Sequence, residues 1–171
     1  MMATFLEKLS NGWKRIAADL DPKNRAEKQL LEALKRDYFE EKMLAQALEQ
    51  ESDRIPYAHL RKKLIDIAEA EKRHARLLEE KIVELGDSIS EHARDLQKQR
   101  DEKQFESTLD LLKILEEEKA EYIEYLDAMA LAREAKRNDI QALLDQIREE
   151  EAVHRKQLMD ILAKLNPLPG K

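Results

Sequence analysis

Two short motifs each place a histidine three residues after a glutamate: Glu71-x-x-His74 and Glu151-x-x-His154. Residues three apart lie on the same side of a helix, so the carboxylate and the imidazole of one motif can converge on a single ion. Two such helices opposed across a bundle would bring all four side chains into one pocket. We therefore predict that both motifs bind metal.

Further carboxylates fall within the apolar stripes of two other predicted helices. Glu41 lies in one stripe, and Glu118 lies in the other, with Glu121 nearer its edge. Glu41 precedes Glu71 by 30 residues, and Glu121 precedes Glu151 by the same distance, as if two helix pairs were copies of one unit. Buried charges cost several kcal/mol each unless they are compensated, so this set favours bound cations over an empty polar core.

Other polar residues of the same types fall away from these stripes. We expect the following to be solvated surface residues: Glu40, Glu117, Glu124, Glu149, Glu150, His59 and His92. Tyr38, Tyr122 and Tyr125 share the inner face and are predicted to be core residues, with hydrogen bonding to the metal ligands as the alternative.

Long helices must position these side chains. Helical periodicity covers about residues 1–20, 25–52, 57–85, 105–135 and 138–165, and the charged segment 87–104 connects the third pattern to the fourth. Asp21-Pro22 ends the first pattern, and Gly86 ends the third. The sequence predicts an all-α four-helix bundle of two helix pairs with a long middle connection. We expect an N-terminal helix at 1–21, the bundle at 22–165 and a tail at 166–171.

Apolar spacing also predicts which side of each helix is buried. Along 105–135 we expect the buried residues to be Leu111, Leu112, Leu115, Tyr122, Leu126 and Met129. The N-terminal segment is amphipathic and is predicted to pack on its own protein or on a partner subunit. Contact of residues 1–20 with a membrane surface is the alternative, and the mixed charges of their polar face argue against it.

Composition excludes several classes of protein. With only 3 Gly, 4 Pro and 5% aromatic residues in 171, an all-β fold is excluded. The absence of Cys excludes disulfides, zinc fingers, thiolate-bound clusters and a cysteine nucleophile. A net charge of -6 argues against a nucleic-acid partner. With no long apolar run and no basic-then-apolar leader, we expect a cytoplasmic location.

The motif set resembles the di-iron carboxylate residues of the ferritin-like superfamily over about residues 25–165. The Glu118-x-x-Glu121 pair is similar to one in the rubrerythrin branch, where its first glutamate also lies 33 residues before the last Glu-x-x-His motif. Two departures stand out. Tyr38 occupies the position 33 residues before Glu71, and Glu41 lies one turn later. Rubrerythrins usually carry a Cys-rich rubredoxin domain, so this Cys-free chain would need an external electron donor.

The resemblance implies roles for individual residues. Glu71 and Glu151 would bridge two Fe ions, with Mn or mixed Fe/Mn as alternatives, and His74 and His154 would be terminal ligands. The remaining positions would be completed by Glu41 and by either Glu121 or Glu118.

The function implied is oxidation of Fe(II) by O₂ or H₂O₂, as in a ferroxidase or a rubrerythrin-like peroxidase, in a homo-oligomer that is a dimer or larger. Three alternatives remain open. One is iron storage or handling in a larger assembly, and another is di-iron monooxygenation of an apolar substrate. The third is a non-enzymatic helical interaction protein with inert inner carboxylates.

Overall fold

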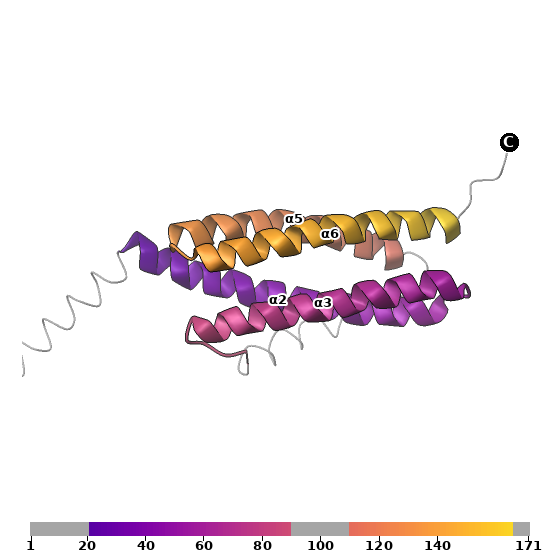
Figure 1. Cartoon of the computed structure of the whole chain (residues 1–171), viewed down its shortest axis with the longest axis horizontal. Helices are drawn as coiled ribbons and strands as arrows, with labels where there is room; N and C mark the ends of the chain where they lie inside the picture. The colour runs from indigo at the N-terminus through magenta and orange to yellow at the C-terminus, as the bar shows by residue number, and fades with distance from the viewer. Residues whose placement is uncertain (1–20, 90–109, 166–171) are drawn as a thin grey trace, which may run out of the picture.

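The computed structural model describes residues 21–89 and 110–165, which form a bundle of four α-helices (Figure 1). The helices are α2 (Pro22–Arg54), α3 (Ala58–Glu84), α5 (Asp110–Glu134) and α6 (Asn138–Leu165). The prediction of an all-α four-helix bundle is confirmed. The predicted helix limits lie within three residues of the observed ones, apart from the start predicted at 105, which lies outside the described residues. The predicted N-terminal helix, most of the connection 87–104, His92 and the tail lie outside the described residues.

The helix limits follow from local chemistry. α2 begins at the predicted Asp21-Pro22 step, where Pro22 occupies the first turn and has no N–H to leave unpaired. The Asp21 carboxylate accepts a hydrogen bond from the backbone N–H of Lys23 at 3.0 Å, which caps the helix. A three-residue turn, 55–57, then reverses the chain into α3.

α3 ends at Gly86, whose φ of 84° lies in the left-handed region. The Gly86 N–H donates to the carbonyl of Val83 at 2.9 Å, and the Asp87 N–H donates to that of Ile82 at 3.2 Å. This pair of bonds is a Schellman motif, which explains why glycine signals the helix end. α5 ends in the same way at Lys136, with φ 60°, where a lysine adopts the conformation that glycine would take more easily.

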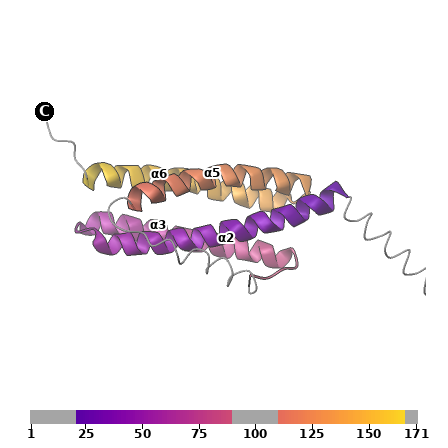
Figure 2. The same ribbon diagram turned by 180° about the vertical axis from the view of Figure 1, so that it is seen from behind.

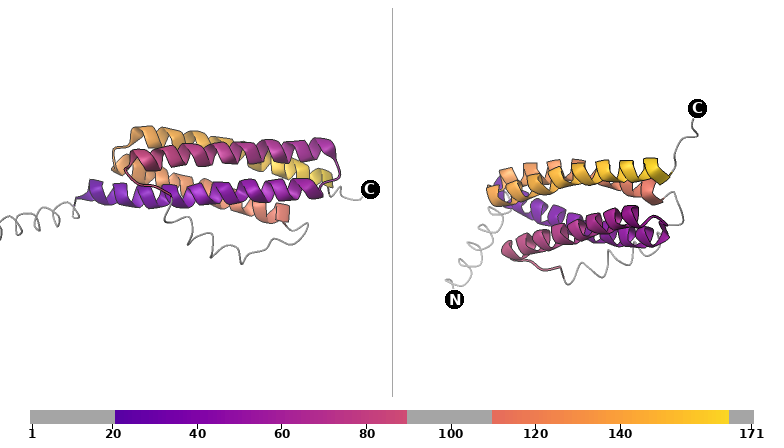
Figure 3. Two further views of the ribbon diagram at one scale, coloured as in Figure 1. Left: turned by 90° about the horizontal axis from the view of Figure 1, so that it is seen from below. Right: turned by 45° about the vertical axis from the view of Figure 1, so that its right-hand side comes forward.

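The four helices pack as two antiparallel pairs. α2 pairs with α3 and α5 pairs with α6, while α2 also packs against α5 and α3 against α6 (Figures 1 and 2). Two further views show the α5–α6 pair lying along the α2–α3 pair (Figure 3). No helix in the described ranges is both long and apolar enough to cross a bilayer.

Two apolar clusters fill the bundle, one toward each end. The first includes Leu30, Leu34, Leu78, Ile82 and Leu144. The second includes Leu48, Leu60, Leu64, Leu158 and Ile161. The middle of the bundle, between these clusters, holds the buried carboxylates and imidazoles. The tightly packed ends therefore fix the positions of the helices around a polar centre.

The buried face of α5 differs from the prediction. Leu112 and Leu126 were expected in the core but are 50% and 44% exposed. The side of α5 that faces the bundle carries Leu111, Ile114, Glu118, Glu121, Tyr125, Ala128 and Ala132. Because carboxylates take core positions on this helix, the apolar residues alone point to a face rotated away from the true one.

Candidate metal centre

His74 on α3 and His154 on α6 face each other across the middle of the bundle. Their imidazole rings are stacked, with centroids 5.8 Å apart. His74 is fully buried and His154 is 7% exposed. Each ring directs Nδ1 toward buried carboxylates, and one of these carboxylates comes from the opposite helix pair. The two predicted motifs are thus brought together.

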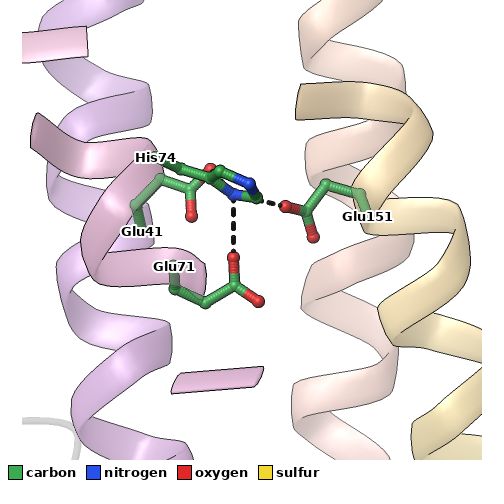
Figure 4. Close-up of side chains that lie close together, drawn as sticks. All are labelled: Glu41, Glu71, His74 and Glu151. Carbon is green, nitrogen blue, oxygen red and sulfur yellow. Dashed lines mark ion pairs between the residues drawn. The ribbon is translucent and has the colours of Figure 1, made fainter. Parts of the chain in front are cut away.

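Glu71 and Glu151 lie between the two histidines. Glu71 places Oε2 3.0 Å from His74 Nδ1 and Oε1 2.8 Å from His154 Nδ1. Glu151 places Oε1 2.9 Å from His74 Nδ1 and Oε2 3.7 Å from His154 Nδ1. Figure 4 shows the His74 side of this arrangement, with Glu71 and Glu151 approaching the ring from α3 and α6. Each carboxylate therefore serves both histidines, which is the geometry of a bridging ligand.

Glu41 and Glu118 divide between the two halves of the centre. Glu41 joins Glu71, His74 and Glu151 in a group whose ligand atoms all lie within 4.8 Å of one another. Glu118 joins Glu71, Glu151 and His154 in a second group of the same kind. The two groups share both central glutamates, so the arrangement suits two cations held side by side.

Glu121 is buried beside these groups but belongs to neither. The sequence offset pairs Glu121 with Glu41, whereas the structure makes Glu118 the counterpart of Glu41 in the two four-residue groups. Glu121 is 7% exposed, and its pKa is raised well above the ordinary value by burial and by repulsion from Glu41 and other carboxylates. It places one more carboxyl group next to the centre.

The other carboxyl groups divide into two classes. Burial, together with repulsion from Glu151 and Glu71, raises the pKa of Glu118 to about 11, and the pKa of Glu41 is also well above its usual range. Burial alone would raise the pKa of Glu71 too, but the nearby imidazoles of His154 and His74 lower it to about 2. Glu71 is therefore ionised in the metal-free protein.

The imidazoles respond in the opposite sense. Burial disfavours their charged forms, but the adjoining carboxylates outweigh it, led in each case by Glu151. As a result, the pKa of His154 rises to about 9, and that of His74 rises further above its ordinary value. In the metal-free protein, protons on the histidines take the place that cations would occupy.

Several buried polar atoms at the centre lack a hydrogen bond from the described part of the chain. They are both side-chain oxygens of Glu71, Glu118 and Glu151, one oxygen each of Glu41 and Glu121, and Nδ1 of both histidines. The Nδ1 atoms and the bridging oxygens are within ion-pair distance, but their orientation is not that of a hydrogen bond. Buried polar atoms are rarely left unpaired, so this donor set fits bound cations.

Two further residues contact the centre: for Tyr125 the sequence offered such a contact as the alternative to a core role, and for Glu150 it predicted none. Tyr125, fully buried, donates a hydrogen bond from its hydroxyl to Oε1 of Glu41. Glu150 was expected in solvent, but its Oε2 lies 3.1 Å from Nε2 of His74. In the sequence, the one indication of a role for Glu150 was its position next to Glu151. The packing of α6 against α3 brings its carboxylate to His74.

The remaining predictions divide between confirmed and wrong. Tyr38 lies in the apolar core and His59 is exposed, both as expected. Tyr122 was expected in the core but is half-buried, and its hydroxyl accepts a hydrogen bond from Arg148 at 2.8 Å. Glu40, Glu117 and Glu124 are half-buried rather than solvated. Glu40 and Glu124 belong to a second acidic group with Asp37.

The solved structures similar to this chain include the following two. A protein from Xanthomonas campestris pv. campestris has a TM-score of 0.67 and 14% identity, covering 82% of this chain and 92% of its own. The bacterioferritin of Desulfovibrio desulfuricans, described with a di-iron site in different catalytic states, has a TM-score of 0.65 and 21% identity. That similarity covers 84% of this chain and 83% of the bacterioferritin. These likenesses establish the fold.

No curated protein matches the sequence. The sequence does match the family described as ferritin-like domain over residues 52–168, which is more than half of the chain. This match covers α3, α5 and α6, and so includes both Glu-x-x-His motifs. With the fold, the buried donor set and this match in agreement, the chain belongs to the ferritin-like domain family.

Proposed function

We propose that this protein is a di-iron carboxylate oxidoreductase that oxidises Fe(II) with O₂ or H₂O₂. The observation that carries the proposal is the sharing of Glu71 and Glu151 between His74 and His154, with one carboxylate oxygen of each directed to each ring. A mixed set of imidazole and carboxylate donors suits iron or manganese better than calcium or magnesium. Two bound iron ions would supply two electrons for reduction of the oxidant.

The ligand roles follow from the two groups. Glu71 and Glu151 would bridge the ions, and His74 and His154 would each hold one ion. Glu41 would complete the His74 half and Glu118 the His154 half. The four carboxylates of the two groups carry four negative charges when ionised, and two divalent cations would balance that charge.

Other properties of the chain support redox chemistry at this position. The ligands lie between two apolar clusters, which exclude bulk water from the centre. Tyr125 holds Oε1 of Glu41 by a hydrogen bond, and the pKa of Tyr125 is raised well above its usual range by burial and by Glu41, so its hydroxyl stays protonated. Glu121, whose pKa is also raised, holds a proton on its carboxyl group beside the ligands.

We further propose that the protein acts as a rubrerythrin-like peroxidase. Support comes from the buried Glu118-x-x-Glu121 pair, which places a spare carboxylate one turn from a ligand. A spare carboxylate could replace a ligand when the charge of the centre changes. The chain has no Cys, so electrons would reach it from a separate donor protein.

Metal analysis tests the proposal directly. Protein loaded anaerobically with Fe(II) should hold about two ions per chain at this centre by mass spectrometry. Glu71→Ala should lower both iron content and thermal stability of the loaded protein, because a bridging ligand is lost. Glu149→Ala, which changes an exposed residue on α6, is the matched control. Unchanged iron content in Glu71→Ala would overturn the assignment.

The oxidant is tested by stopped-flow absorbance. Fe(II)-loaded protein is mixed in separate experiments with O₂ and with H₂O₂, and the rate of Fe(III) formation is followed. A rubrerythrin-like peroxidase should react faster with H₂O₂, by about tenfold or more, which corresponds to a difference of at least about 1.4 kcal/mol in barrier. A faster reaction with O₂ would support a ferroxidase and contradict the peroxidase proposal.

A further inference from the structure

A second acidic group lies on the α2–α5 side of the bundle, apart from the seven residues described above. Asp37 and Glu40 on α2 and Glu124 on α5 place one carboxylate oxygen each within 4.8 Å of one another. Asp37 is 3% exposed, whereas Glu40 and Glu124 are half-buried. None of these three residues contributes to the two four-residue groups of the metal centre.

Asp37 gives this group a property that an ordinary surface cluster lacks. Its Oδ1 accepts a hydrogen bond from Arg36 at 3.0 Å, but its Oδ2 is buried and receives no hydrogen bond from the described part of the chain. A buried carboxylate oxygen left in this state is costly unless something else binds it. Asp37 also contributes one carboxylate oxygen to the acidic group, so a cation bound there would lie beside this buried carboxylate.

Arg36 pairs with all three carboxylates of the group, and its contact with Glu40 Oε2 is the longest, at 4.0 Å. Its guanidinium lies 3.0 Å from Asp37 Oδ1 and 2.7 Å from Glu124 Oε2. It is 45% exposed, so it sits at the outer side of the group. Its hydrogen bond reaches Oδ1 of Asp37 and leaves Oδ2 of the same carboxylate without one from the described residues.

The group also adjoins a solvent-accessible groove. A groove of about 520 Å³ runs between α2 and α5, and both Arg36 and Glu124 line it. Glu32 and Asp127 line the same groove, together with Lys28 and apolar residues of both helices. Ions in solution would therefore reach the group from this side of the bundle.

The inner side of the group leads to the metal centre. Asp37 precedes Glu41 on α2 by four residues, and Glu124 follows Glu121 on α5 by three, so the two clusters are about one helical turn apart, or roughly 5–6 Å. Tyr125, next to Glu124, contacts Glu41. The acidic group thus lies between the groove and the buried ligands.

We propose that Asp37, Glu40 and Glu124 form a third divalent-cation site, which takes Mn(II) or Fe(II) from the α2–α5 groove. An all-carboxylate ligand set suits such hard cations. Passage of the ion onward to the buried centre rests on the function proposed above, whereas the binding site itself does not.

Equilibrium dialysis against Mn(II), with bound metal measured by mass spectrometry, tests the site. Wild type should bind about three ions per chain, and Asp37→Asn/Glu124→Gln about two, because only the all-carboxylate site is lost. Glu71→Gln/Glu151→Gln should retain about one ion, and this ion should disappear when the four substitutions are combined. Glu32→Gln/Asp127→Asn removes two carboxylates from the same groove and should bind as wild type does.

The failures of the two proposals are distinguishable. If Asp37→Asn/Glu124→Gln binds as many ions as wild type with the same affinity, the third site is overturned and the dinuclear centre is unaffected. If wild type binds a single ion that this variant loses, the third site stands and the dinuclear centre fails.

A second variant guards against loss of folding. Glu124→Gln alone changes a half-buried residue and should weaken binding of the third ion at least about tenfold, with helical circular dichroism unchanged. Unaltered affinity in this folded variant would also overturn the third site.

Discussion

The hydroxyl of Tyr125 on α5 donates a hydrogen bond to the Glu41 carboxylate on α2, so the packing of two neighbouring helices holds a predicted metal ligand in place. Both side chains are at most 1% exposed. Glu41 lies one turn away from the position expected by family resemblance, and the contact with Tyr125 fixes where its carboxylate points.

Replacing Tyr125 with Phe should therefore weaken the His74 half of the centre. The variant keeps the ring in the core but removes the donor, and loss of a supporting hydrogen bond of this kind costs about 10- to 100-fold in metal affinity. Competition with a chromophoric chelator measures that affinity. Tyr122→Phe is the control, because Tyr122 is half-buried and contacts Arg148. Equal affinity of Tyr125→Phe and wild type would show that Glu41 needs no such support.

Glu150→Gln should also act on one half of the centre. The Glu150 carboxylate lies 3.1 Å from Nε2 of His74. This contact orients the imidazole ring and makes its Nδ1 a stronger metal ligand. Glu150 directly precedes Glu151, whereas the residue that directly precedes Glu71 is Ala70, which has no carboxylate to support His154. We therefore expect Glu150→Gln to weaken Co(II) binding at the His74 half by about tenfold and to leave the His154 half unchanged. Visible absorption of Co(II) during titration would resolve the two steps. Equal weakening of both sites, or none, would contradict this asymmetry.

Metal binding should release protons. In the metal-free protein at pH 7 the raised pKa values leave protons on Glu41, Glu118, Glu121 and both histidines. Loading two Zn(II) ions should displace about three to five protons per chain, measured by calorimetry in buffers of different ionisation enthalpy. Glu118→Gln should release about one proton fewer. Release of no protons would mean that the ions bind elsewhere.

The metal-free protein should lose stability as the pH rises. A histidine whose folded pKa is raised stabilises the fold at low pH, and this contribution disappears as the pH rises from the unfolded value of 6.5 through the folded value, about 9 for His154. Carboxyl groups with raised pKa act in the same direction. Glu118 loses its proton above about pH 4.5 in the unfolded chain, whereas in the fold its pKa of about 11 keeps the proton bound.

Glu71 acts in the opposite direction, because its pKa is lowered to about 2 in the fold. Its contribution to stability is fully present above about pH 4.5 and is lost as the pH falls toward 2. Between about pH 5 and pH 9 each group that retains an extra proton in the fold should lower the free energy of unfolding by about 1.4 kcal/mol per pH unit. Thermal unfolding of chelator-treated and metal-loaded protein across this range measures the effect. A metal-free melting temperature that rises with pH would contradict the protonation pattern.

The amino-acid sequence by itself determined the helices and the set of ligand candidates. Asp21-Pro22 and Gly86 mark helix limits because their backbone preferences act within a few residues. Glu71 and His74 share a side of α3 because three residues span nearly one turn, whatever surrounds the helix. These features depend on a single helix, so periodicity predicts them.

Only the tertiary structure decided how the candidates combine. The sequence offset matched Glu121 with Glu41, but in the structure Glu118 is the counterpart of Glu41 in the two four-residue groups. The buried face of α5 and the contact of Glu150 with His74 were likewise missed. Residues on different helices meet according to the rotation and sliding of each helix, which packing over the whole length of the bundle sets. No local pattern contains that information, because it arises only when the apolar clusters at both ends pack.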